Sequence, residues 1–170
     1  TIPMLGSGIA SGMLSGQLLA ESIGENMSRG VKGDALFKVG RLWRYQVKVY
    51  REFGAEHAAV DVMKRAVLGY PDALINWMLG SDILTNDEMC KLAAGKMLRV
   101  GLKEALRKLN ITEYSKWGTL IKINNMLLKC GRVYTLARSI PRNFDPNITR
   151  TWEKHMRYYF RPTRKERNAE

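Results

Sequence analysis

The clearest structural signal in the chain is the stretch DALFKVGRLWRYQVKVY, residues 34–50. Its apolar side chains recur at the three- and four-residue steps that place them on one face of a helix. These residues are Leu36, Phe37, Leu42, Trp43, Tyr45, Val49 and Tyr50. Asp34 precedes them and is a residue type that caps helix N-termini. The stretch therefore predicts an amphipathic helix that begins at Asp34 and is interrupted at Gly54.

The same helical period continues along the chain on both sides of this stretch. Thr85 followed by Glu88 fits a capping box, with Thr85 as the N-cap of a helix that runs to about Ala94. Further helices are predicted at 7–23, 60–68, 73–79, 98–109, 112–130, 133–140 and 152–160. Glycines at 24, 30, 33 and 131 and prolines at 141 and 146 are expected to separate them. Because no stretch shows the two-residue alternation of a strand, the predicted fold is mostly α.

Composition and charge describe a globular chain with a basic excess. The 170 residues are 45% hydrophobic and 26% charged, which is enough for a domain with a core. Lysine and arginine number 28 against 16 aspartate and glutamate, so the net charge is +12. This excess favours an anionic partner, such as a membrane surface, a phosphorylated substrate or nucleic acid. The chain starts at Thr1 and enters an apolar run at once, so we expect it to be a piece of a longer protein.

The segment 2–20 carries no charge and holds glycines at positions 8, 12 and 16, as in close-packed membrane helices. It also contains Pro3, three serines, Gln17 and four glycines, which make it poorly apolar for a bilayer span. We therefore do not expect a transmembrane helix. A signal peptide is not expected either, because no positively charged segment precedes the run.

The cysteines and histidines show no metal-binding spacing. Cys90 and Cys130 lie far apart and form no CxxC pair, and the two histidines are isolated. The sequence contains no GxGxxG after a predicted strand, no Walker loop and no HExxH. We predict no metal site, and we expect both cysteines to be free core thiols, with a disulfide between them as the alternative.

A glycine-rich turn, Pro3-Met4-Leu5-Gly6-Ser7-Gly8-Ile9, opens the first predicted helix. Glycine lets a ligand approach the backbone closely, and the first N–H groups of a helix favour negative charge. A reduced flavin carries negative charge at its N1 and O2 edge, which suits such a turn. The alternative is that the turn and the stripe of glycines behind it only allow close packing against another element. The residues alone do not separate these two interpretations.

The segment PMLGSGIASGMLSGQLLAE, residues 3–21, resembles the second flavin motif of the geranylgeranyl reductase family, within the hydroxybenzoate-hydroxylase-like flavoproteins. The matching parts are Pro3, Gly6-Ser7-Gly8-Ile9, Ser15-Gly16 and Ala20-Glu21. The resemblance implies FAD as cofactor and hydride transfer to isoprenoid double bonds. It also implies that backbone N–H groups contact the isoalloxazine at Leu5, Gly6, Ser7, Gly8 and Ile9. No side chain in the segment is an obvious acid, so no catalytic residue is assigned.

The resemblance further implies a larger α/β, Rossmann-like reductase of which this chain is the C-terminal helical part. Residues 1–24 would end the FAD-binding domain, and residues 25–170 would form the helical region. The family's Gly-Asp-Ala motif and dinucleotide fingerprint are absent and would precede Thr1. The N-terminal FAD-binding portion is then a partner of this chain, and we expect a cytoplasmic protein that is peripheral on the membrane.

Two further patterns suit a polyprenyl lipid substrate and an anionic membrane surface. An apolar wall could be formed by Tyr70, Trp77, Met78, Leu79, Trp117, Met126 and Leu127. Basic stripes could be formed by Lys96, Arg99, Lys103, Arg107 and Lys108, and by Arg157, Arg161 and Arg164 beside Tyr158 and Tyr159. Ordinary core packing and solvated faces remain the alternatives. Other functions left open are a flavin-dependent monooxygenase, a quinone-linked dehydrogenase, and a basic all-α module for protein or nucleic acid, the last ranked below lipid.

Overall fold

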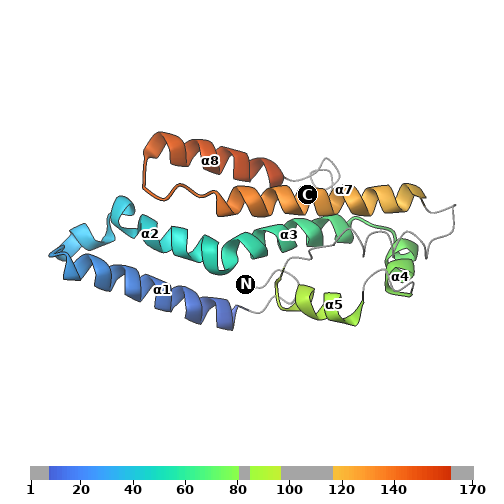
Figure 1. Cartoon of the computed structure of the whole chain (residues 1–170), viewed down its shortest axis with the longest axis horizontal. Helices are drawn as coiled ribbons and strands as arrows, with labels where there is room; N and C mark the ends of the chain where they lie inside the picture. The colour runs from blue at the N-terminus through green and yellow to red at the C-terminus, as the bar shows by residue number, and fades with distance from the viewer. Residues whose placement is uncertain (1–7, 81–84, 97–116, 162–170) are drawn as a thin grey trace, which may run out of the picture. The chain divides into compact units, whose positions relative to one another are not determined.

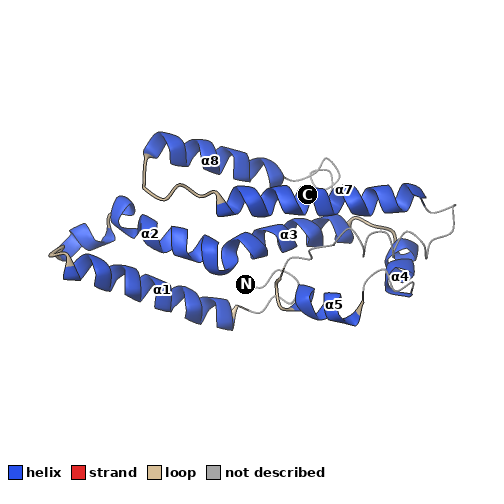
Figure 2. Ribbon diagram, in the orientation of Figure 1, coloured by secondary structure: helices blue, strands red, loops and turns tan. Residues whose placement is uncertain are grey.

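The structure, a computed structural model, describes residues 8–80, 85–96 and 117–161. Every regular element in these ranges is a helix, as Figure 2 shows, so the predicted mostly-α fold is confirmed. None of the helices in the described part of the chain is both long and apolar enough to cross a bilayer.

The helices form two compact units. Among the described residues, one unit comprises 8–55 and 133–161 and is called here the α1–α2 unit; the other comprises 56–80, 85–96 and 117–132. The α1–α2 unit holds α1 (Ile9–Ser28), the 3-10 turn η1 (Gly33–Phe37), α2 (Val39–Val49), the π-helical turn η2 (Tyr50–Gly54), the end of α7 (Trp117–Arg138) and α8 (Pro146–Tyr159). The other unit holds most of α3 (Ala55–Leu68), α4 (Asp72–Gly80), α5 (Asn86–Ala93) and the first part of α7. The boundary predicted after Gly24 falls inside α1.

Two tryptophans anchor the core of the α1–α2 unit. The Trp43 indole N–H donates to the carbonyl oxygen of Pro141 at 2.6 Å. The Trp152 indole N–H donates to the carbonyl oxygen of Leu136 at 2.8 Å, and the Tyr50 ring meets the Trp152 ring edge-on at 5.1 Å. Each buried indole N–H therefore has an acceptor. Burial of the two rings stabilises the fold without the cost of an unpaired hydrogen-bond donor.

The second unit buries residues of α3, α4, α5 and α7. Its buried apolar residues are Ala59, Val60, Val62, Met63, Met78, Leu92, Ile123, Met126 and Cys130. The predicted capping box is confirmed: the Glu88 N–H donates to the Thr85 hydroxyl, and the Thr85 N–H donates to the Glu88 carboxylate at 2.9 Å. In this way each of the two side chains accepts a hydrogen bond from the backbone N–H of the other residue at the start of α5.

The first helix is longer than predicted, because Gly24 lies inside α1 and does not end it. The helix ends instead at Ser28, and Gly30 follows the C-cap Arg29 with a left-handed φ of 79°. The Gly30 N–H donates to the Met27 carbonyl oxygen at 2.9 Å, and the Val31 N–H donates to the Asn26 carbonyl oxygen at 3.1 Å. This pair of bonds is a Schellman motif, which requires a residue with positive φ; a mid-helix glycine costs only about 1 kcal/mol.

We expect Gly24→Ala and Gly30→Ala to change stability in opposite directions. A methyl group at Gly24 would meet no atom within 4 Å in an ordinary helical backbone, so the substitution should stabilise by up to about 1 kcal/mol. The same methyl group at Gly30 would strain the left-handed turn and should destabilise by about 1 kcal/mol. Urea unfolding of the two variants measures the difference. Equal effects of the two substitutions would contradict this account of the end of α1.

Three other predicted boundaries were wrong. Asp34 does not begin one long helix: η1 ends at Phe37, Lys38 is extended at φ −63° and ψ 137°, and α2 begins afterwards. Gly54 does not interrupt the helix but closes the π turn, where a Cβ would lie 3.1 Å from the Val49 carbonyl oxygen. Gly131 lies within α7, because buried neighbours on the same helix outweigh the small helix penalty of glycine.

The helix predicted around Trp152 is confirmed as α8, which begins directly after the 139–145 connection. Asp145 is its N-cap and accepts from the N–H groups of Asn147 and Ile148 at 2.8 and 3.0 Å. Pro146 occupies the first helical turn, where its missing N–H costs nothing.

Candidate functional site

Only some of the predicted cofactor-binding residues lie in the part of the chain that the structure describes. Leu5, Gly6 and Ser7 lie outside the described residues, whereas Gly8 and Ile9 lie within them. Gly8 is the N-cap of α1, with φ −111° and ψ −10°. Its carbonyl oxygen accepts from the Gly12 N–H at 2.7 Å and from the Ser11 hydroxyl at 3.3 Å. Ile9 opens the helix with a side chain that is 79% exposed.

The start of α1 lacks the caps found on α5 and α8. No side chain accepts from its first N–H groups within the described residues, and its first turn contains no acidic residue. By contrast, Thr85 caps α5 and Asp145 caps α8. The partial positive charge at the N-terminus of α1 is therefore not offset by its own side chains.

The face of α1 that packs on α2 is the serine stripe, not the glycine stripe. The Ser15 and Tyr45 hydroxyls are hydrogen-bonded at 2.5 Å, and the buried Asn26 amide donates to the Arg41 carbonyl oxygen at 3.3 Å. The buried Ser22 hydroxyl donates to the Leu18 carbonyl oxygen at 2.8 Å, which satisfies a polar group that faces the core. Small hydroxyl side chains thus let α1 and α2 approach closely.

The glycine stripe faces away from α2. A Cβ on Gly12 or Gly16 would meet no described atom within 4 Å, apart from near neighbours in the helix. Met13, beside them, is 73% exposed, and Ile9 at the helix start is 79% exposed. The expectation that these glycines pack tightly against another element is therefore not met within the described residues. The first half of α1 instead presents an open, uncharged face.

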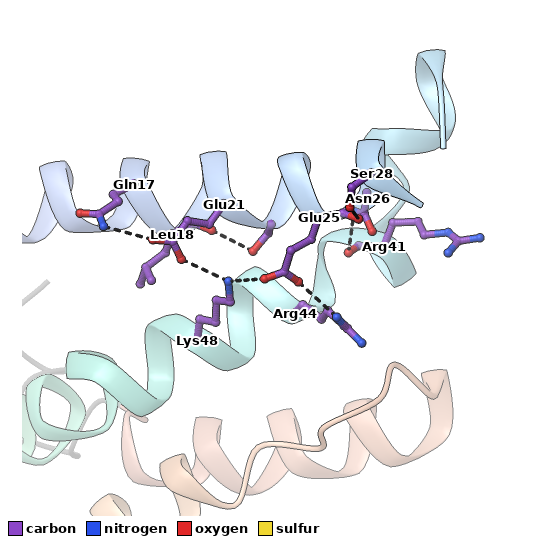
Figure 3. A network of polar contacts seen from close by, with 10 residues as sticks. Gln17, Leu18, Glu21, Glu25, Asn26, Ser28, Arg41, Arg44 and Lys48 are labelled. Carbon is purple, nitrogen blue, oxygen red and sulfur yellow. Dashed lines mark hydrogen bonds and ion pairs between the residues drawn. The ribbon is translucent and has the colours of Figure 1, made fainter. Parts of the chain in front are cut away.

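Ion pairs hold the second half of α1 against α2, as Figure 3 shows. Lys48 on α2 donates to Glu25 at 2.9 Å and to Glu21 at 3.2 Å, and Arg44 donates to Glu25 at 3.2 Å. The hydrogen bonds from Lys48 and Arg44 lower the pKa of Glu25, and the bond to Glu25 raises the pKa of Lys48. Hydrogen bonds from Gln17 and then Lys48 lower the pKa of Glu21.

Glu21 takes part in these contacts from the end of the segment 3–21. It accepts from Gln17 on its own helix and from Lys48 on α2. Such exposed pairs add little stability, and they form only when α1 and α2 pack in this register. Together with the Ser15–Tyr45 bond, they fix the direction in which the start of α1 points.

The described residues of the predicted apolar wall differ in their burial. Met78 and Met126 are buried in the core, whereas Leu79 is largely exposed. The structure does bring Tyr70 to Met126, with the Tyr70 hydroxyl 3.8 Å from the Met126 sulfur. Burial raises the pKa of Tyr70. The Trp117 side chain lies outside the described part of the chain.

The predicted basic stripes are only partly described. Lys96 lies within the described residues, and the rest of its stripe, residues 99–108, lies outside them, as does Arg164. Arg157 is exposed and lies 3.7 Å from Glu153 on α8. The Tyr158 and Tyr159 rings meet edge-on at 5.5 Å, which makes a small aromatic surface beside Arg157.

The cysteines are both free, but only one is a core thiol. Cys130 is buried, and burial raises its pKa to about 11, so it is protonated and unreactive at neutral pH. Cys90 is exposed on α5, which corrects the expectation that both lie in the core. Within the described residues, no group of three or more histidine, cysteine, aspartate or glutamate side chains could hold a metal ion.

Comparisons with known proteins found no family model, no curated protein and no solved structure that matches the chain.

Proposed function

We propose that the chain is the C-terminal part of an FAD-dependent oxidoreductase that reduces isoprenoid double bonds of lipids. The observation that supports this most directly is the start of α1. It combines a glycine N-cap, no side-chain cap and no acidic residue in the first turn. That arrangement suits the negative N1–O2 edge of a reduced flavin, and the segment around it resembles a flavin motif.

The residues proposed to hold the cofactor are Leu5, Gly6, Ser7, Gly8 and Ile9, through backbone N–H groups. The open face of α1 at Gly12 and Gly16 leaves room for a planar ring or for the FAD-binding portion that carries it. When bound, reduced FAD would supply the hydride for reduction of an isoprenoid double bond, and a proton would complete the addition. The chain's own contribution would be to bind and orient the ring at the start of a helix that is packed on α2.

The ion pairs and the serine stripe support this role. A helix N-terminus positions a ligand only if the helix itself is held, because catalysis requires reacting atoms to be placed accurately. Lys48, Arg44 and Tyr45 hold α1 from one side and leave its opposite face open. We therefore propose that the flavin lies on the open side of α1. A cytoplasmic location is proposed from the family resemblance.

The test is to purify the protein that carries this chain and to measure the FAD released on denaturation. The reduced protein is then incubated anaerobically with a geranylgeranyl lipid, and mass spectrometry follows the lipid. We expect bound FAD in near-stoichiometric amount and a gain of one dihydrogen for each reduced double bond. Oxygen insertion would favour a monooxygenase, and reduction of an added quinone in place of the lipid would favour a dehydrogenase. Absence of flavin would overturn the proposal.

A further inference from the structure

One end of the α1–α2 unit combines exposed apolar and basic side chains. We call it the basic–apolar tip and define it as residues 27–41 and 142–144. It comprises the end of α1, η1, the start of α2 and part of the α7–α8 connection, which lie at the same end of the unit in Figure 1. The Trp43 and Phe144 rings are 5.5 Å apart, and a Cβ on Gly40 would lie 3.5 Å from the Phe144 ring. The two segments of the tip are therefore in contact, although about 100 residues separate them.

Four large apolar side chains of the tip are exposed to solvent. Phe37 and Val39 are each 62% exposed, and Met27 and Phe144 are also exposed. Single exposed apolar residues are ordinary on a protein surface, but a group of them beside one another marks a surface that binds something apolar. Phe37 and Val39 lie on either side of the extended Lys38, at the junction between two short elements. Side chains at such a junction can enter an apolar phase without rearrangement of a helix.

The tip is also strongly basic. It contains five basic residues and one acidic residue, Asp34, so its net charge is 5 − 1 = +4. The basic residues, all exposed, are Arg29, Lys32, Lys38, Arg41 and Arg142. In the described part of the α1–α2 unit, ion pairs are made by Arg44, Lys48 and Arg157 and by none of these five. Their charges therefore remain available to an external anion.

We propose that the basic–apolar tip is the surface through which the protein binds an anionic lipid bilayer. Phe37, Val39, Met27 and Phe144 would enter the boundary between headgroups and acyl chains, and the surrounding lysines and arginines would contact anionic headgroups. A nucleic acid would pair with the basic residues but offers no apolar phase for Val39 or Met27. A bilayer with anionic headgroups can bind both the basic and the apolar residues of the tip. The proposal does not depend on flavin binding, because vesicle binding requires no cofactor.

The test is co-sedimentation of the 170-residue chain with vesicles of phosphatidylcholine alone or mixed with phosphatidylserine. We expect binding to the anionic vesicles that weakens as salt is raised. The charge variant replaces Lys32 and Lys38 with glutamine and should bind on the order of tenfold more weakly at low salt. The matched control replaces Lys122 and Lys129, two exposed lysines of α7, with glutamine and should bind as the wild type does.

A second pair of variants tests insertion. Phe37→Ser with Val39→Ser should weaken binding to anionic vesicles by about tenfold or more, because both apolar side chains would be lost from the lipid. The control is Ile121→Ser with Leu128→Ser, two similarly exposed apolar residues of α7. All four residues are largely exposed, so circular dichroism should report an unchanged fold.

Several outcomes would overturn the proposal. One is equal binding to neutral and anionic vesicles at low salt. Another is an equal loss of vesicle binding in the tip variants and the α7 controls. A third is binding to duplex RNA that is tighter than binding to vesicles and is unaffected by the serine substitutions. A protein that lacks flavin but binds vesicles through the tip would overturn the proposed reductase function and leave this inference standing.

Discussion

Gly8→Val should release flavin from the purified protein while most of its helical structure is retained. Gly8 is the N-cap of α1, and its backbone, at φ −111° and ψ −10°, is accessible to any residue. The substitution therefore introduces no backbone strain of its own. If the flavin ring lies against this turn, a branched side chain would occupy the space of the ring. A β-branched N-cap also costs about 1 kcal/mol of helix stability, so a second position is needed to separate the two effects.

Gly12→Val provides that second position, and Gly24→Val is its matched control. Both glycines lie inside α1, and a Cβ on either would meet nothing within 4 Å. The two substitutions therefore have the same effect on helix propensity. Only Gly12 lies on the open face next to the proposed cofactor, so Gly12→Val should lose flavin and Gly24→Val should keep it. Gly33 is unsuitable as a control, because its φ of 58° makes any substitution strained.

The measurement is the absorbance of bound FAD together with the thermal midpoint of unfolding. A packing defect alone would lower the midpoint without selective loss of flavin. If the Gly8 and Gly12 variants keep full flavin occupancy and an unchanged reduction rate, the turn has only a structural role. That result would remove the main support for the proposed function.

Trp152→Ala should destabilise the protein by about 3–5 kcal/mol, the usual cost of removing a large aromatic side chain from a core. Trp152 is only 8% exposed, and its ring packs edge-on against Tyr50. The indole also donates to the Leu136 carbonyl oxygen, which would lose that donor. The cavity and the lost hydrogen bond both lower the free energy of unfolding.

Two further variants separate these contributions. Trp152→Phe keeps much of the ring but removes the donor, so it should cost less than Trp152→Ala, about 1–3 kcal/mol. Tyr158→Ala removes an aromatic ring of the same helix that is 66% exposed and should change stability by less than about 0.5 kcal/mol. Urea unfolding followed by circular dichroism measures all three. Equal effects of Trp152→Ala and Tyr158→Ala would show that Trp152 is not part of a cooperative core.

Local sequence patterns determined the helical class of the fold and one of its caps. The three- and four-residue spacing of apolar residues predicted helices because that period is set by helix geometry alone. The Thr85–Glu88 capping box was predicted correctly for the same reason, since its partners are three residues apart. The glycine turn at Leu5–Ile9 was identified from sequence as a candidate anion site, and its function stays a prediction.

Packing between distant segments decided the boundaries that sequence misplaced. Gly24, Gly54 and Gly131 were expected to end helices, because glycine has weak helix propensity. All three lie within continuous helical segments, where buried neighbours supply more stability than one glycine removes. Gly30 ends α1 because its positive φ allows a Schellman motif, a conformation that the sequence cannot specify among several nearby glycines.

The two faces of α1 and the basic–apolar tip were decided by tertiary structure alone. The sequence showed a stripe of glycines and a stripe of serines but not which one faces α2; the Ser15–Tyr45 bond and the Lys48 ion pairs settle that. Phe37 was predicted to be buried on the apolar face of a single long helix. The break at Lys38 turns it outward instead. Phe144 joins it from the other end of the chain, and no local pattern can predict such a meeting, because it depends on how α2 packs against the α7–α8 connection.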